Sequence, residues 1–297
     1  MNIQEIKNLK VGKVLENIDL KKYTTYSAGG IGRVLVLPES VESLKILLQH
    51  LKDNKIKHKV LGFGSNLIFV NDNYDGVLIR LDELNDLEII GSTVKVGAGY
   101  NLIKLCLTVA KHDLTGLEFA SGIPGSIGGA VYMNAGAYKS DMGYVIEKIK
   151  VLTPDLEVKN LYNKELDFHY RTSFLQKNPG YICLNATLKL KHGKKDAIMA
   201  VIRDRKLRRL ESQPLEFPSA GSVFRNPLND YAGRLIEELG FKGYNIGGAC
   251  VSEKHANFII NTGGATGSDI KKLIIEIQSK VKEKYGIELK VEQEFVE

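Results

Sequence analysis

The chain has 297 residues, of which 43% are hydrophobic and 26% charged, so its composition disfavours disorder and allows two globular domains. Its formal net charge of +6 suits an anionic small molecule as well as a nucleic acid, so charge alone does not choose a ligand. No run of about 18 apolar residues occurs. The opening MNIQEIKNLK also lacks the character of a signal or transit peptide, so we expect a cytoplasmic protein without a membrane span.

The three cysteines indicate neither a disulfide framework nor a metal centre. Cys106, Cys183 and Cys250 are widely spaced and odd in number, and the chain has neither CxxC spacing nor a paired histidine cluster. We therefore expect reduced thiols and no metal.

A parallel βαβ lobe is predicted for residues 20–85. A Gly-Gly turn precedes an apolar strand within Thr24–Pro38, and Ser40 opens a stretch whose apolar residues have helical spacing. Two strand-forming runs flank GFGSN within Lys59–Val70, and Gly76–Leu81 forms another strand. Strands that alternate with a helix are typical of a parallel sheet.

The GFGSN turn at residues 62–66 has two possible roles. It lacks the third glycine of a dinucleotide-binding fingerprint, and the residues after Asn66 favour a strand instead of the required helix. Successive N–H groups of a tight glycine turn can nevertheless bind phosphate, with help from Ser65 and Asn66. The alternative is a plain hairpin turn.

A second lobe, residues 86–193, is predicted to be rich in antiparallel strands. Leu87–Gly99 reads as a hairpin around Gly91-Ser92, and Asn101–Lys111 as a short helix. Strands are expected in Val145–Thr153, Glu157–Asn160 and Tyr181–Lys191, because their apolar residues alternate.

The stretch Gly116–Gly143 holds seven glycines among 28 residues. Glycine allows backbone to approach a ligand closely, so the stretch is either a surface shaped around a flat or phosphorylated ligand or a bend with close helix packing.

Composition changes near residue 193, where we place a domain boundary. A basic helical stretch follows, containing Arg203, Arg205, Lys206, Arg208 and Arg209. It is either a solvated face or a contact for an anion, and the lack of interleaved aromatic residues counts against single-stranded nucleic acid. The remainder predicts an α+β domain with helices at about 232–239 and 268–285, a strand at about 257–260 and a terminal strand from about 287.

Few single residues stand out chemically. Ser222 lies in a glycine-flanked turn without the GxSxG elbow of hydrolases, and an exposed hydroxyl there can deliver a proton. Arg171 either stacks on its aromatic neighbours or binds an anion. Glu292 and Glu294 are expected on one face of the terminal strand, where carboxylates usually solubilise an edge. His169 and His255 are interpreted as structural.

Eight motifs in order carry a family resemblance from about residue 20 onward. They are TTYSAGG, LGFGSNLI, GLEFASGIPGSIGGAVYMNAGAY, FHYRTSF, QPLEFPSAGSVFRNP, AGRLIEELGFKG, GGACVSEKHANFIIN and GIELKVEQE. Together they resemble the UDP-N-acetylenolpyruvoylglucosamine reductases, in the shorter class without an inserted tyrosine loop. Two departures are Tyr23, where asparagine is usual, and Gln293, where an apolar residue is common.

The resemblance implies an α+β protein with a two-lobed FAD-binding domain of the vanillyl-alcohol-oxidase-like type at residues 1–193. A substrate-binding domain would follow at 194–297. FAD would be held non-covalently. The residues expected to hold it are Gly62, Gly64, Ser65, Asn66, Gly122, Ile123, Pro124, Gly125, Ser126, Gly128, Gly129 and Ala130.

The resemblance also implies a reaction, the NADPH-dependent reduction of the enolpyruvyl group of UDP-N-acetylglucosamine enolpyruvate to give UDP-N-acetylmuramate for peptidoglycan. Arg171 would stabilise the enolate, Ser222 would donate the proton, and Glu292, chosen over Glu294 by its spacing, would donate a hydrogen bond. Arg225 and Asn226 would bind the UDP-sugar substrate. No nucleic acid, membrane or obligatory protein partner is implied.

Two other functions stay open at this point. The first is a flavin oxidase of the same fold, and the second is a non-catalytic flavin- or nucleotide-binding protein that contacts nucleic acid through Lys194–Arg209.

Overall fold

The computed structural model describes residues 2–297, and the chain divides into two compact units. Unit 1 contains Met1–Glu16, Val34–Gly62 and Gly76–Leu207, and unit 2 contains Asn17–Arg33, Phe63–Asp75 and Arg208–Glu297. Both units are discontinuous in sequence. They are therefore a different division from the domains expected with a boundary at 193, and that boundary stays a prediction.

Several elements run from one unit into the other: β1 (Gly12–Asp19), β2 (Ile31–Pro38), β5 (Asn73–Arg80) and α6 (Lys195–Ser212). The other helices of unit 1 are α1 (Ile3–Asn8), α2 (Val41–Asp53), α3 (Leu102–Lys111), α4 (Ile127–Tyr132) and α5 (Phe174–Lys177). Its strands are β3 (His58–Leu61), β6 (Leu87–Ile90), β7 (Thr93–Gly97), β8 (Leu114–Thr115), β9 (Gly136–Ala137), β10 (Ser140–Asp141), β11 (Ile146–Leu152), β12 (Val158–Tyr162), β13 (Ile182–Lys189) and β14 (Lys191–His192).

The predicted parallel pairing is present in a four-stranded sheet of order β1-β2-β5-β3, in which β3 and β5 are parallel. The helix between β2 and β3 is α2. It begins where the Ser40 hydroxyl accepts the Ser43 N–H (3.0 Å), and its leucines at 44, 47, 48 and 51 are buried. The helical spacing of the apolar residues therefore gave the right element.

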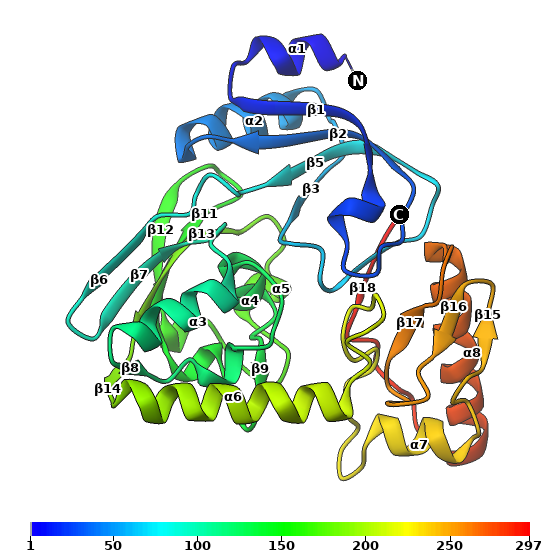
Figure 1. Ribbon diagram of the computed structural model, residues 1–297. Coiled ribbons are helices and arrows are strands. Elements are labelled where there is room, and N and C mark those ends of the chain that lie inside the picture. Colours follow the sequence, from blue (N-terminus) through cyan, green and yellow to red (C-terminus); the bar gives the residue numbers. More distant parts are fainter. Residues whose placement is uncertain (1) are drawn as a thin grey trace. The chain divides into compact units, whose positions relative to one another are not determined.

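The predicted antiparallel pairing is also present. A five-stranded sheet has the order β12-β11-β13-β7-β6, and helix α4 packs against β13 (Figure 1). Strands β6 and β7 pair up to Ile90 and Thr93, so Gly91-Ser92 is a two-residue turn, and Gly91 takes the positive φ (+56°) that such turns need.

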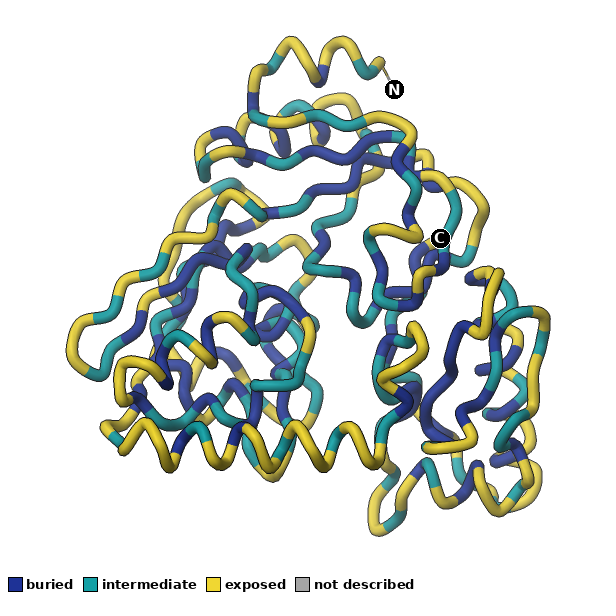
Figure 2. The backbone as a smooth tube through the Cα atoms, viewed as in Figure 1, coloured by how far each residue is buried: buried dark blue, intermediate teal, exposed yellow. Residues whose placement is uncertain are grey.

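Helix α6 shows how the basic stretch folds. Its buried residues in unit 1 are Ile198 and Ile202, and most of the helix is exposed along its length (Figure 2). The charged residues thus form mainly a solvated face, and Arg205 also lies over the Tyr138 ring, with 4.8 Å from Cζ to the ring centroid.

Unit 2 contains a small antiparallel sheet and two helices. Its elements are β4 (Leu67–Phe69), α7 (Ala232–Glu238), β15 (Asn245–Ile246), β16 (Ala249–Val251), β17 (Ile259–Asn261), α8 (Gly267–Tyr285) and β18 (Glu294–Val296). The sheet has the order β15-β16-β17, and β18 pairs separately with β4 in parallel. Helix α8 carries a capping box at Thr266 and ends at Gly286 in the left-handed conformation.

Two expectations are corrected by this topology. The strands on either side of GFGSN do not pair, since β3 pairs with β5 and β4 with β18, so the plain-hairpin interpretation is wrong. The terminal strand is shorter than predicted, because only Glu294–Val296 is a strand, and Glu292 precedes it. Glu292 and Glu294 therefore do not share a face of one strand.

No helix among residues 2–297 combines the length and the apolar character required to cross a membrane. Cys106, Cys183 and Cys250 are free thiols, and burial raises the pKa of Cys106 to about 12. Such a thiol stays protonated and behaves as a small apolar side chain.

Candidate active site

In unit 1, the middle of the glycine stretch Gly116–Gly143 lies against the end of a parallel strand. Gly62 follows β3, and a Cβ on it would come within 2.9 Å of the Ser126 hydroxyl oxygen. Ser126 caps α4 by accepting the Gly129 N–H (3.2 Å). A Cβ at Gly62 would therefore press on the Ser126 hydroxyl, and the Gly129 backbone lies at ordinary contact distance beyond it.

The first N–H groups of α4 already have acceptors. The N–H of Ile127 donates to the Tyr100 carbonyl (2.9 Å) and that of Gly128 to the Ala98 carbonyl (2.8 Å). A Cβ on Gly128 would also meet the Cβ of Ala98 at 3.1 Å. Gly128 therefore serves close packing inside unit 1, so the packing alternative accounts for this glycine.

Arg171 occupies a strained turn in the same unit. Its φ is +53°, a left-handed value that is unfavourable for a residue with a Cβ. The turn is closed by two hydrogen bonds, from His169 N–H to the Thr172 carbonyl (3.1 Å) and from Thr172 N–H to the His169 carbonyl (3.0 Å). The Arg171 Cζ lies 5.2 Å from the Tyr170 ring centroid, a cation–π contact that leaves both interpretations of Arg171 open.

The turn is fastened to the C-terminal end of α4. Ser173 donates through its hydroxyl to the Tyr132 carbonyl (2.7 Å), and the Gln176 side-chain amide donates to the same carbonyl (2.8 Å) and to the Arg171 carbonyl (3.2 Å). Helix α4 thus lies near Gly62 at its start and holds the Arg171 turn at its end. Sequence reasoning missed Ser173 and Gln176, although both lie within five residues of Arg171.

In unit 2, Ser222 lies in a segment held between two others. On one side it forms a bridge with Phe258, and the Val223 N–H donates to the Asn257 carbonyl (2.9 Å). On the other side the Glu292 N–H donates to the Val223 carbonyl (2.8 Å). The segments that carry Ser222 and Glu292, which are 70 positions apart in the sequence, therefore lie side by side.

Glu292 is also held by the GFGSN turn. The Asn66 side-chain amide donates to the Glu292 carbonyl (3.0 Å), and the Glu294 N–H donates to the Asn66 carbonyl (2.9 Å). Asn66 thus uses its side chain to fix the segment that carries Glu292.

The turn itself shows a feature expected of an anion site. Gly64 has a φ of +69°, and a Cβ there would lie 1.9 Å from the Tyr23 carbonyl oxygen, so only glycine fits. The Thr25 N–H donates to the Gly64 carbonyl (3.2 Å), while the Thr25 hydroxyl oxygen is buried without a hydrogen-bond partner among residues 2–297. A buried hydroxyl beside a glycine turn fits an oxygen-rich ligand such as the FAD pyrophosphate.

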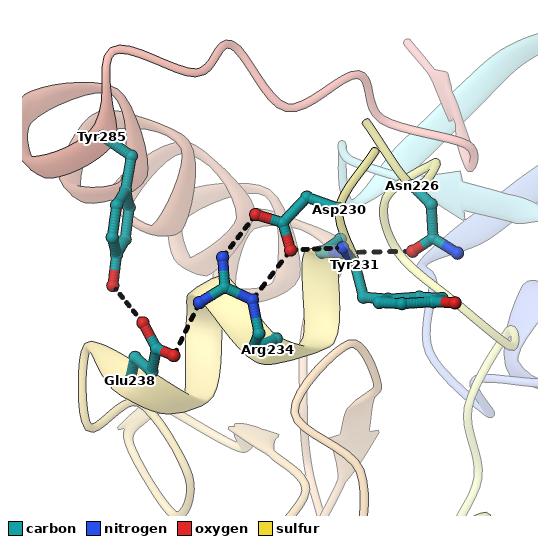
Figure 3. Close-up of polar contacts among 7 residues, drawn as sticks. Asn226, Asp230, Tyr231, Arg234, Glu238 and Tyr285 are labelled. Carbon is teal, nitrogen blue, oxygen red and sulfur yellow. Dashed lines mark hydrogen bonds and ion pairs between the residues drawn. The ribbon is translucent and has the colours of Figure 1, made fainter. Parts of the chain in front are cut away.

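The Asn226 side chain caps the start of α7, as Figure 3 shows. Its side-chain oxygen accepts the Ala232 N–H (3.1 Å). The neighbouring Asp230 accepts from Arg234 Nε (2.8 Å), and Arg234 in turn donates to Glu238 (2.6 Å). The pKa of Asp230 is lowered, chiefly by its hydrogen bonds with Arg234, so the network is ionised at neutral pH.

His255 supports the Ser222 segment indirectly, through hydrogen bonds that involve Asn257. Its Nδ1 accepts the Asn257 N–H (3.2 Å), and the Asn257 side chain bonds Phe224 twice, donating to its carbonyl (2.8 Å) and accepting its N–H (3.0 Å). The pKa of His255 is lowered, mainly by burial, with Lys242 lowering it further. The imidazole is therefore neutral in the folded protein at neutral pH.

A pH effect on stability follows from His255. Because its folded pKa lies below its unfolded value, its contribution is complete above the unfolded pKa of about 6.5 and is lost as pH falls through the folded value. Because at most one proton is involved, the free energy of unfolding should fall by at most about 1.4 kcal/mol per pH unit in this range. Denaturant titrations between pH 5 and 8 check it, and His255→Gln should flatten the slope. An unchanged slope in that variant would contradict the assignment.

Comparisons with known proteins give the class and the family of the chain. Residues 32–162 match the model of an FAD binding domain, which defines the class: the protein is an FAD-dependent enzyme. Residues 213–296 match the C-terminal domain of UDP-N-acetylenolpyruvoylglucosamine reductase.

The chain is 49% identical to UDP-N-acetylenolpyruvoylglucosamine reductase of Bacillus licheniformis over 296 residues, covering 99% of this chain and 97% of the relative. It is 45% identical to that of Bacillus subtilis over 295 residues, with the same coverage. The chain belongs to the UDP-N-acetylenolpyruvoylglucosamine reductase family.

A solved structure supports the fold of the whole chain. The crystal structure of UDP-N-acetylenolpyruvylglucosamine reductase from Thermus caldophilus has a TM-score of 0.81 and 35% sequence identity, covering 96% of this chain and 98% of that one. The expected architecture, an FAD-binding domain plus the C-terminal domain of this family, is confirmed. The protein is a flavin-dependent, NADPH-using reductase of peptidoglycan precursor synthesis.

Proposed function

We propose that this chain reduces UDP-N-acetylenolpyruvoylglucosamine to UDP-N-acetylmuramate. The similarity to reductases of that name over 99% of the chain supports the substrate. The observation that carries the chemistry is the hydrogen bond from the Glu292 N–H to the Val223 carbonyl in unit 2, since it puts the segment with the Ser222 hydroxyl beside the segment with the Glu292 carboxyl group.

Cofactor binding is assigned to glycine-rich backbone in each unit. Bound FAD would carry hydride between NADPH and the enolpyruvyl group. In unit 1 it would lie along Gly62 and along Gly122, Ile123, Pro124, Gly125, Ser126, Gly128, Gly129 and Ala130. In unit 2 the pyrophosphate would meet Gly64, Ser65 and the Thr25 hydroxyl, and Asn66 would act mainly by holding Glu292.

Arg171 is assigned to the substrate carboxylate. Hydride addition to the methylene carbon leaves negative charge that delocalises into this carboxylate, and a fixed guanidinium stabilises that charge more strongly than it stabilises the ground state. The strained turn and its anchors at Ser173 and Gln176 support the role, because they hold the Arg171 backbone in one conformation.

Ser222 is assigned as the proton donor and Glu292 as a second hydrogen-bond donor. The proton from Ser222 would go to the carbon next to the carboxylate, and a protonated Glu292 would hydrogen-bond the enolate. Arg225 would bind the diphosphate or carboxylate, and Asn226 would donate to substrate through its amide NH₂ group, since its oxygen caps α7.

The remaining assignments concern organisation and setting. We place the FAD-binding domain at 1–193 and the substrate-binding domain at 194–297, and we propose a cytoplasmic enzyme that needs neither nucleic acid, membrane nor a protein partner.

One experiment tests the proposed function. Purified protein is expected to be yellow, to lose its absorbance near 450 nm on anaerobic addition of NADPH, and to regain it on addition of the enolpyruvyl sugar nucleotide, as the two half-reactions require. UDP-N-acetylglucosamine serves as the matched control, because it lacks the enolpyruvyl group. Bleaching without recovery, or equal recovery with the control, would disprove the substrate.

A further inference from the structure

Gln293 is buried beside the Ser222 turn and uses its whole side-chain amide there. It is 4% exposed. Its Nε2 donates to the carbonyl of Ala220 (3.1 Å) and to that of Gly221 (3.3 Å), the two residues before Ser222. Its Oε1 accepts the hydroxyl of Tyr26 (2.9 Å). Both ends of the amide are therefore committed.

Tyr26 holds this amide from the opposite side. It is 1% exposed, and burial raises the pKa of its hydroxyl, so the proton stays in place and the hydroxyl keeps donating. The Tyr26 backbone is fixed in turn, because the Asn261 side-chain amide donates to its carbonyl (2.9 Å). The TTYSAGG motif thus supplies a rigid donor to Gln293.

Burying the polar side chains of Gln293 and Tyr26 costs free energy, so their presence here requires an explanation. A buried amide and phenol are tolerated because each is hydrogen-bonded, and an apolar pair would fill the same space without that requirement. What the polar pair adds is direction. Gly221 has a φ of +74°, a left-handed value that favours glycine, and the bonds from Gln293 to the Ala220 and Gly221 carbonyls hold this turn in one orientation.

We infer that Gln293, held by Tyr26, is a positioning residue that fixes the turn at Gly221 and thereby the direction of the Ser222 hydroxyl. The inference rests on the proposed function, in which Ser222 donates the proton. It assigns a role to a position where the family commonly has an apolar residue, and to a motif that carries no reacting group.

Removal of the amide is expected to slow the second half-reaction selectively. Gln293→Leu should lower the rate of flavin reoxidation by substrate about tenfold, with flavin reduction by NADPH unchanged, because a misdirected donor costs rate without affecting the first step. Gln293→Glu should behave similarly, since a carboxylate cannot donate to two carbonyls. Tyr26→Phe should have a smaller effect, about threefold, because the bonds to the turn remain.

Two further readouts separate positioning from simple loss of stability. The solvent isotope effect on reoxidation should rise in Gln293→Leu, because proton donation becomes slower relative to hydride transfer. Amide hydrogen exchange at 220–223 should also become faster, and this measurement needs no turnover. Gln278→Leu is the matched control, because Gln278 likewise donates to a backbone carbonyl in unit 2, that of Leu289 (2.8 Å).

The outcomes distinguish this inference from the proposed function. If Ser222→Ala slows reoxidation but Gln293→Leu changes neither reoxidation nor exchange beyond the Gln278→Leu control, the positioning role is wrong and the proton donor stands. If Ser222→Ala leaves reoxidation intact, the proton donor is wrong. In that event faster exchange at 220–223 still demonstrates that Gln293 fixes the turn.

Discussion

Ser222→Ala is expected to leave flavin reduction by NADPH at its normal rate and to slow reoxidation by the enolpyruvyl substrate about 10²- to 10⁴-fold, the range that a positioned general acid contributes. The reason is that only the second half-reaction needs a proton at carbon. Anaerobic stopped-flow measurement of each half-reaction at 450 nm checks the prediction.

The hydroxyl can be removed without disturbing the fold around it. The segment is held by backbone bonds of Val223 and by the Asn257 side chain, none of which uses the Ser222 hydroxyl. Ser219→Ala, three residues earlier, is the control and should retain both rates. Equal slowing of both half-reactions in Ser222→Ala would show that the residue acts on flavin binding instead.

Arg171→Gly is expected to separate activity from stability. Reoxidation should fall about 10²- to 10³-fold, as when one charge-stabilising donor is removed from an active site. The free energy of unfolding should change by no more than about 1 kcal/mol, because relief of the left-handed φ offsets the entropy cost of glycine. Denaturant titration beside stopped-flow kinetics measures both quantities.

Lys139→Gly provides the matched control for this variant. Lys139 is also a cation with a positive φ (+59°), and it lies in the two-residue turn between β9 and β10. It should show the same small change in stability with no loss of activity. Arg171→Lys should recover only part of the rate, because lysine keeps the charge but lacks the planar fork. A large loss of stability in Arg171→Gly would mean that the stacking on Tyr170 is mainly structural.

Much of the fold was accessible from local patterns. Helical spacing predicted α2, α3 and α8, and alternation with turn residues predicted the β6–β7 hairpin, because these elements depend on neighbours within a few residues. The end of the chain was predicted less well. The residues before β18 are held by the Ser222 segment through single bonds instead of by a continuous strand, and no period in the sequence encodes that.

The supports of the candidate site were not predictable in the same way. Motifs pointed to Arg171, Ser222 and Glu292 as single positions, and their roles remain proposals. Asn66 binds Glu292 across 226 positions of sequence, and Tyr26 binds Gln293 across 267. A single sequence contains no signal for such pairs. Gln293 was therefore interpreted as a minor departure from the family pattern, because its partners lie far away in the sequence.

The parallel pairing of β4 with β18 has a consequence for biosynthesis. Residues 67–69 leave the ribosome more than 220 residues before their partners at 294–296, so for most of translation β4 has no strand to pair with. The nascent chain must therefore keep this apolar segment, Leu67-Ile68-Phe69, from aggregating until residues 294–296 have been synthesised. All of unit 1 has been synthesised once residue 207 is added, whereas unit 2 still lacks residues 208–297, so unit 1 can fold first.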